Sequence, residues 1–292
     1  MRRTMLFWIL AFVITAASAI YQRVTGPTYP LTGSARIYSA SIAYRLDRSH
    51  GGEGDHEVSL VTGTPAVAGR LEWKRHNTDD GWSEVPMVFS DGALRASLPH
   101  QPPAGKLDYR VRLRQGTAEA LIPATGGVVI RFRGDVPLFI LITHVIAMFG
   151  AMLLSTRTGL ETCNAQPRYR RLTYWTIGFL AAGGMILGPI VQKYAFGAFW
   201  TGWPFGYDLT DNKTLIALVA WIVAAVAIPR VRNPRWWLLS AAVVVLVVFL
   251  IPHSVLGSEL DYRALDTQQP PSGGTVPSGP GGPGRGTPGG GM

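Results

Sequence analysis

The stretch GVVIRFRGDVPLFILITHVIAMFGAMLLS, residues 127–155, contains the change of pattern that decides the fold of this chain. Up to Gly134, Ile and Phe alternate with arginines, which is typical of a β-strand with one buried face. From Val136 to Ser155 the residues are almost continuously apolar, over a length that can cross about 30 Å of hydrocarbon. We therefore expect a β domain before residue 135 and transmembrane helices after it.

Apolar runs of similar length recur along the chain. They lie at 4–20, 136–155, 172–192, 211–229 and 236–252. Two arginines precede the first run, and Ala17-Ser18-Ala19 resembles a signal-peptidase site. Residues 1–22 are therefore either an uncleaved transmembrane anchor or a cleaved signal segment. We favour the anchor, because the run is rich in aromatic residues and close to spanning length.

Residues 23–134 have a different character. Segments such as GRLEWKRH and LDYRVRLRQ alternate in polarity, and clusters of Gly, Pro and Asp separate them. Short strands at this spacing predict an all-β sandwich. GKLDYRVRL, residues 105–113, resembles a late strand of immunoglobulin-like and fibronectin type III domains. The resemblance implies a tyrosine-corner contact for Tyr109 and a core position for Trp73, but no particular activity, because such sandwiches carry many functions.

The predicted fold class is thus a membrane all-α bundle of four to five transmembrane helices with an inserted external all-β sandwich domain. Residues 135–258 form the four-helix part, in which Gly183 and Gly184 allow close helix approach and Pro189 predicts a kink. Residues 259–292 are expected to form a disordered tail, because 267–292 is rich in Gly and Pro and nearly lacks apolar residues.

The positive charge of the chain is concentrated beside the apolar runs. The formal charge is +9, yet basic and acidic residues nearly balance within 23–135. The excess lies in Arg2, Arg3, Arg157, Arg168, Arg170, Arg171, Arg230, Arg232 and Arg235. This is the positive-inside pattern of a multi-pass protein in a lipid bilayer, and it argues against a nucleic-acid partner. It predicts a bacterial inner (cytoplasmic) membrane protein with loops 156–171 and 230–235 inside, and with residues 23–134 and the C-terminal tail outside.

Polar residues collect on the predicted outer side. Asp208, Asp211 and Lys213 begin one span, His253 and Glu259 follow the last, and His144 lies in the outer half of 136–155. Ionisable residues within spans are functional candidates, so we expect a shared outward-facing pocket. Helix capping by Asp208, an interfacial aromatic belt and an interhelical hydrogen bond from His144 are the structural alternatives.

The segment between two of the spans, GAFWTGWPFGYDLTDNKT, residues 197–214, carries two tryptophans and two aspartates. It resembles the tryptophan-rich external segment of the haem-handling membrane proteins of cytochrome c biogenesis. That resemblance implies that Trp200 and Trp203 lie against a haem and that His144 and His253 are its ligands. A divalent metal held by the same histidines is the related possibility.

Three hypotheses for function remain open. The first is an accessory or assembly protein of the cell envelope, whose sandwich binds other envelope proteins. The second is a haem- or metal-binding membrane protein that uses His144 and His253. The third is a membrane enzyme acting on a lipid-linked or small external substrate through Asp208, Asp211 and His253. The sequence contains no nucleotide-binding loop, no H-E-x-x-H and no C-x-x-C, and its single cysteine, Cys163, excludes an intramolecular disulfide.

Overall fold

The computed structural model describes residues 2–38, 40–252, 257 and 259–268, and the chain divides into two compact units, Met1–Leu260 and Asp261–Met292. In the second unit the described residues form the short helix α7 (Tyr262–Gln268), whose first amides donate to the Asp261 carboxylate. A helix therefore lies within the segment 259–292, where the sequence predicted disorder. The rest of that tail, 269–292, and His253 lie outside the described residues.

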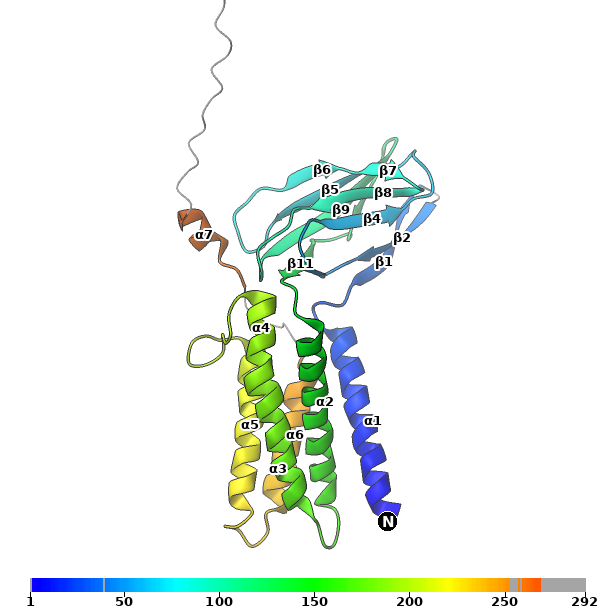
Figure 1. Ribbon diagram of the computed structural model, residues 1–292. Coiled ribbons are helices and arrows are strands. Elements are labelled where there is room, and N and C mark those ends of the chain that lie inside the picture. Colours follow the sequence, from blue (N-terminus) through cyan, green and yellow to red (C-terminus); the bar gives the residue numbers. More distant parts are fainter. Residues whose placement is uncertain (1, 39, 253–256, 258, 269–292) are drawn as a thin grey trace, which may run out of the picture. The chain divides into compact units, whose positions relative to one another are not determined.

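Apolar helices form one part of the first unit (Figure 1). They are α1 (Arg2–Thr25), α2 (Leu138–Glu161), α3 (Tyr169–Leu180), which continues through the π-helix η1 (Ala181–Leu187) into α4 (Gly188–Phe196), α5 (Leu209–Ala227) and α6 (Arg235–Leu250). Among the described residues, four stretches are long and apolar enough to cross a membrane: Arg3–Thr25, Leu138–Glu161, Tyr169–Phe196 and Leu209–Ala227. Helix α6 is apolar but shorter. These helices lie where the sequence predicted spans, as in a multi-pass membrane protein.

Helix α2 is longer than predicted, because it runs to Glu161 instead of ending at Ser155. Arg157, which the sequence analysis placed in the following loop, is only 3% exposed. Its guanidinium lies 2.7 Å from the Glu161 carboxylate one turn later. The rings of Phe7 and Trp8 on α1 lie 5.5 and 5.4 Å from the same guanidinium. Ion pairing and cation–π contact thus let a charged residue continue the helix.

The two arginine-rich loops lie side by side. The Arg235 guanidinium donates to the Ala165 carbonyl over 2.9 Å. Pro167 and Tyr169 line the same surface hollow as Arg232 and Arg235. The turns that join α2 to α3 and α5 to α6 therefore lie at one end of the bundle.

The helices pack tightly around small residues. A Cβ on Gly184 would overlap the Thr214 side chain of α5, and one on Gly183 would lie 2.9 Å from the Ala147 Cβ of α2. The predicted close approach at these glycines is confirmed. Trp221, fully buried in the core, donates from Nε1 to a buried partner, the Ser155 hydroxyl, over 3.1 Å, so its polar atom is satisfied.

The β domain is built from three sheets. In the first, β1 (Leu31–Ile37) pairs with β2 (Ala40–Leu46). The strands of the second sheet follow the order β3 (Ser49–Gly51), β11 (Val128–Arg133), β9 (Lys106–Gln115), β5 (Ala68–Arg75), β6 (Ser83–Pro86), and β10 (Ala118–Ile122) also pairs with β9. The strands of the third sheet follow the order β4 (His56–Val61), β8 (Ala93–Leu98), β7 (Val88–Ser90). All pairs are antiparallel except β3 with β11.

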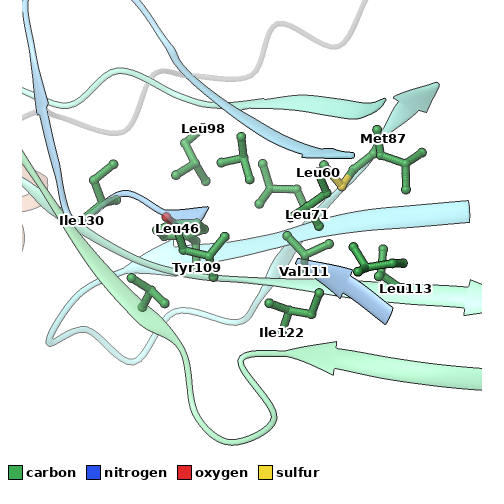
Figure 2. Packing of buried hydrophobic residues seen from close by; sticks show 14 of the residues in the cluster. Leu46, Leu60, Leu71, Met87, Leu98, Tyr109, Val111, Leu113, Ile122 and Ile130 are labelled. Carbon is green, nitrogen blue, oxygen red and sulfur yellow. The ribbon is translucent and has the colours of Figure 1, made fainter. Parts of the chain in front are cut away.

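A single apolar core joins these sheets (Figure 2). It includes Leu46 of the first sheet, Tyr109 and Val111 of the second and Leu60 of the third, which together give a sandwich-like arrangement. Alternation along β9 follows the expected two-residue period, with every second side chain in the core. Trp73 is half-buried at the margin of this core rather than at its centre.

Tyr109 does not form the tyrosine corner that the resemblance implied. Its hydroxyl donates to the Asp47 carbonyl over 2.7 Å, far upstream in the sequence at the end of β2. A tyrosine corner instead bonds to backbone a few residues away. The contact therefore ties the first sheet to the second, and burial raises the pKa of the phenol.

Candidate functional site

A cavity of about 370 Å³ lies among residues of α1, α2, η1, α4, α5, α6 and β11. One part of its wall is polar and includes Arg131, His144, Gln192, Asp208 and Asp211. Another part is apolar and includes Leu141, Val145, Met148 and Phe149 from α2. Three of the predicted site residues, His144, Asp208 and Asp211, therefore share one cavity.

The two aspartates fix the loop that precedes α5. Asp208 is the N-cap of α5, and its carboxylate accepts from the Thr210 amide over 2.8 Å. Asp211, in the first turn, accepts from the Thr201 amide over 2.7 Å. Both residues are less than a tenth exposed. Negative charge at this end of the helix also complements its dipole, so the predicted capping role is confirmed.

Gln192 extends the same network from α4. Its amide nitrogen donates to the Thr201 hydroxyl over 2.6 Å, and the residue is 9% exposed. The Thr201 backbone is in turn held by Asp211. A chain of hydrogen bonds thus links the middle of α4, the loop and the first turn of α5 along the polar wall of the cavity.

His144 lies where α2 faces the π-helix. Its Nδ1 is 3.0 Å from the carbonyl oxygen of Gly183, which also accepts the Gly188 amide in the wide π-turn. A carbonyl can only accept, so Nδ1 carries the hydrogen and Nε2 is left as an acceptor. The predicted interhelical hydrogen bond is therefore present. It also orients the ring as a backbone carbonyl orients many metal-bound histidines.

Arg131 supplies the positive charge of the site. It is 7% exposed, and its guanidinium lies 3.8 Å from the centre of the Phe196 ring at the end of α4. Burial lowers its pKa to about 10, although the charges of Asp208 and Glu259 oppose this shift. Arg131 consequently remains positively charged at neutral pH, and the ring screens it from water.

Lys213 and Gln22 serve a different purpose. The Lys213 ammonium donates to the Ile251 carbonyl over 2.7 Å, and the Gln22 amide donates to the Phe249 and Ile251 carbonyls over 2.7 and 3.2 Å. These carbonyls belong to the end of α6, where backbone acceptors lack helical partners. Lys213, which the sequence placed in the polar site, thus caps α6 and joins it to α5, while Gln22 joins α6 to α1.

Several other predicted residues lie elsewhere. Trp200 and Trp203 do not line the cavity: the Trp200 indole donates to the Trp203 carbonyl, and Trp203 is 67% exposed. Glu259 pairs with Lys106 over 3.1 Å and accepts from Asn77 over 2.8 Å, both in the β domain. His253 lies outside the described residues. The structure therefore gathers only part of the predicted set.

Sequence reasoning missed Arg131, Gln192 and Phe196. Alternation along β11 places Arg131 on the face opposite the core, where a solvated arginine is ordinary. That face is instead covered by Phe196. Gln192 carries no charge and lies in a predicted span, where a buried amide is itself a sign of a hydrogen-bonding partner.

Comparison with models of known protein families gave no match, and a search of curated proteins found no significant relative. Within the part of the chain that the structure describes, no group of three or more His, Cys, Asp or Glu side chains is placed to hold a metal ion. The cavity is therefore the feature of the molecule that points to a function.

Proposed function

We propose that the protein is a multi-pass protein of the bacterial inner membrane that binds one amphiphilic molecule in the cavity lined by Arg131 and His144. The proposal depends on one observation: the wall of the cavity is polar and charged in one part and apolar in another. A volume of about 370 Å³ is within the usual range for small-molecule sites. A lipid or lipid-linked molecule has the matching division between head and tail.

The distribution of arginine supports an outward-facing cavity. The loops 162–168 and 228–234 hold Arg168, Arg230 and Arg232, and they meet at one end of the bundle. The Gly134 amide, just after β11, donates to the Ala195 carbonyl at the end of α4, so the β domain adjoins the other end. By the positive-inside rule the arginine-rich end is cytoplasmic, which puts the β domain and the cavity on the periplasmic side.

The apolar wall gives such a ligand access from lipid. Val145 and Phe149 line the cavity, yet they are 38% and 43% exposed on the surface of α2. In a bilayer that surface meets acyl chains, because helices of this kind expose apolar residues to lipid. An acyl chain could then lie along α2 while the head group reaches Arg131.

Binding without turnover fits the polar wall better than catalysis does. The carboxylates of Asp208 and Asp211 both accept backbone amides that hold the loop in place. A general base must instead be free to take a proton from substrate. We therefore place the protein among accessory or assembly factors of the envelope, with the sandwich as the surface for other envelope proteins.

The proposal is tested by measuring whether an amphiphilic molecule occupies the cavity. Full-length protein in lipid nanodiscs is released into the gas phase, and bound amphiphile is counted by native mass spectrometry. Met148→Trp places an indole in the cavity and should abolish retention. Ile146→Trp is the matched control, because Ile146 lies on the same helix, is 62% exposed and does not line the cavity. Equal retention by both variants would refute the proposal.

Haem binding is the second candidate, and the hydrogen bond from His144 Nδ1 to Gly183 favours it. That bond leaves Nε2 available to a metal, as in many haem and zinc sites. The test is an absorbance spectrum of the purified protein. A Soret band that is lost in His144→Ala would support haem, and a colourless preparation after growth with added haem precursor would eliminate it.

A further inference from the structure

A second cavity, of about 410 Å³, lies where α1 meets the β domain, and its wall is strongly basic. Arg23 comes from the last turns of α1, Arg45 and Arg48 from β2 and the turn after it, and Arg131 and Arg133 from β11. Asp47 is the one acidic residue among the described residues of the wall. Five arginines and one aspartate thus line the cavity, which leaves its described wall with an excess of positive charge.

The charges of Asp208 and Glu259 act on Arg131, but the charges of the other four arginines are little offset within the described residues. Arg45 lies 3.4 Å from Asp47, but both side chains are well exposed, so this pair contributes little. Among the residues that the structure describes, Arg23, Arg48 and Arg133 form no ion pair. Like charges held near one another repel, and a bound anion relieves that repulsion.

The residue types in the wall indicate which chemical class of anion the cavity can bind. Among the described residues of the wall, every cation is arginine and none is lysine. Arginine presents a planar fork that makes paired hydrogen bonds to carboxylate or phosphate, whereas lysine acts as a point charge. A cavity of this volume holds a phosphate group together with part of what it esterifies.

The position of the cavity points to the membrane surface. Arg23 is two residues before Thr25, where α1 ends, and Phe196, the last residue of α4, forms another part of the wall. Both helices belong to stretches long enough to span a bilayer. If they do, this cavity lies at the depth of the phospholipid head groups, where clustered basic residues meet anionic lipid.

We propose that Arg23, Arg45, Arg48, Arg131 and Arg133 form a binding site for a phosphate group, carried either by an anionic phospholipid or by a free phosphate compound. The site is separate from the amphiphile cavity, with which it shares Arg131 and Phe196. It does not require that the amphiphile proposal be correct. The shared chemistry is bidentate recognition of phosphate oxygens by arginine.

Two probes distinguish the sources of the phosphate. The first arm titrates detergent-solubilised, phosphate-free protein with inorganic phosphate and with glycerol phosphate, using isothermal titration calorimetry. The second reconstitutes the protein in nanodiscs of phosphatidylcholine with or without phosphatidylglycerol, and counts retained anionic lipid by native mass spectrometry. Binding in the first arm identifies a soluble phosphate compound. Selective retention of phosphatidylglycerol in the second arm identifies a lipid head group.

The variants are matched in charge. Arg48→Gln with Arg133→Gln should weaken binding about tenfold or more, because each arginine removed takes charge-assisted hydrogen bonds with it. Arg36→Gln with Arg114→Gln removes the same charge from exposed positions outside the cavity and should leave binding unchanged. Arg48→Lys with Arg133→Lys keeps the charge but not the fork, and should give an intermediate loss. Met148→Trp should not affect this site.

Two outcomes would overturn the proposal. One is the absence of measurable binding in both arms by the folded wild-type protein. The other is an equal loss of binding in the cavity double variant and in the exposed double variant, which would mean that net charge alone attracts the probe. Failure of amphiphile retention together with intact phosphate binding would remove the proposed function and leave this site standing.

Discussion

The guanidinium of Arg131 lies 3.8 Å from the centre of the Phe196 ring, and this contact joins the last strand of the β domain to the end of α4. Both residues line both cavities. On one side of the contact the wall carries acidic and apolar groups, and on the other it is rich in arginine. The pair therefore separates two chemically different sites.

Removing the ring should loosen this junction. Phe196→Ala deletes a buried cation–π contact worth about 2 kcal/mol. We expect faster limited proteolysis between residues 133 and 138, while the core of the β domain, seen by amide hydrogen exchange, keeps its protection. Phe196→Tyr retains a ring of similar shape and should behave as wild type. Unchanged cleavage in the alanine variant would mean that the Gly134–Ala195 hydrogen bond holds the junction by itself.

The N-cap of α5 gives a prediction about stability. Asp208→Ala should lower the free energy of unfolding by about 1 kcal/mol, because the Thr210 amide loses its acceptor. Asp208→Ser keeps an acceptor and should lose much less. Thermal unfolding in one fixed detergent measures both. If the serine variant were as unstable as the alanine variant, the charge of Asp208 beside Arg131 would matter more than the cap.

Acid should weaken the β domain through Glu72. This side chain is 1% exposed and lies 2.5 and 2.6 Å from the guanidinium groups of Arg110 and Arg112. Burial alone would raise the pKa of the carboxyl, but the hydrogen bonds and charges of the two arginines hold it below its usual range. The stabilisation is therefore complete above the unfolded pKa of about 4.5 and is lost as the pH falls through the lower folded value.

The variant Glu72→Gln tests the predicted loss of stability at low pH. The variant should be less stable than wild type at pH 7, and its unfolding temperature should change less between pH 5 and pH 3. Glu84→Gln is the control, because Glu84 pairs with Arg70 on the surface and contributes little. A variant with the full acid sensitivity of wild type would assign that sensitivity to other groups, such as His56, whose pKa is lowered by burial and by neighbouring His50.

The sequence located the helices well because each apolar run is a local pattern. Asp208 was recognised as a cap for the same reason, since it lies just before the helix it caps. Arg131 was missed, and the hydrogen bond of Lys213 to α6 was not foreseen, because their partners lie far along the chain, on α4 and at the end of α6. The sequence alone does not distinguish a buried cation from an exposed one, because the aromatic ring or carbonyls that surround the buried cation come from distant parts of the chain. The same limit applies to the arginine-rich cavity, whose arginines come from three separate segments.

Orientation is the last prediction, because the outward-facing site depends on it. Cys163 is an exposed thiol in the turn after α2. If the arginine-rich end is cytoplasmic, a membrane-impermeant maleimide should not label Cys163 in intact spheroplasts but should label it in inverted vesicles. Ala66→Cys in a Cys163→Ser background is the control, because Ala66 is an exposed loop residue of the β domain and should react in spheroplasts. Labelling of Cys163 from outside would invert the proposed topology and place both cavities on the cytoplasmic side.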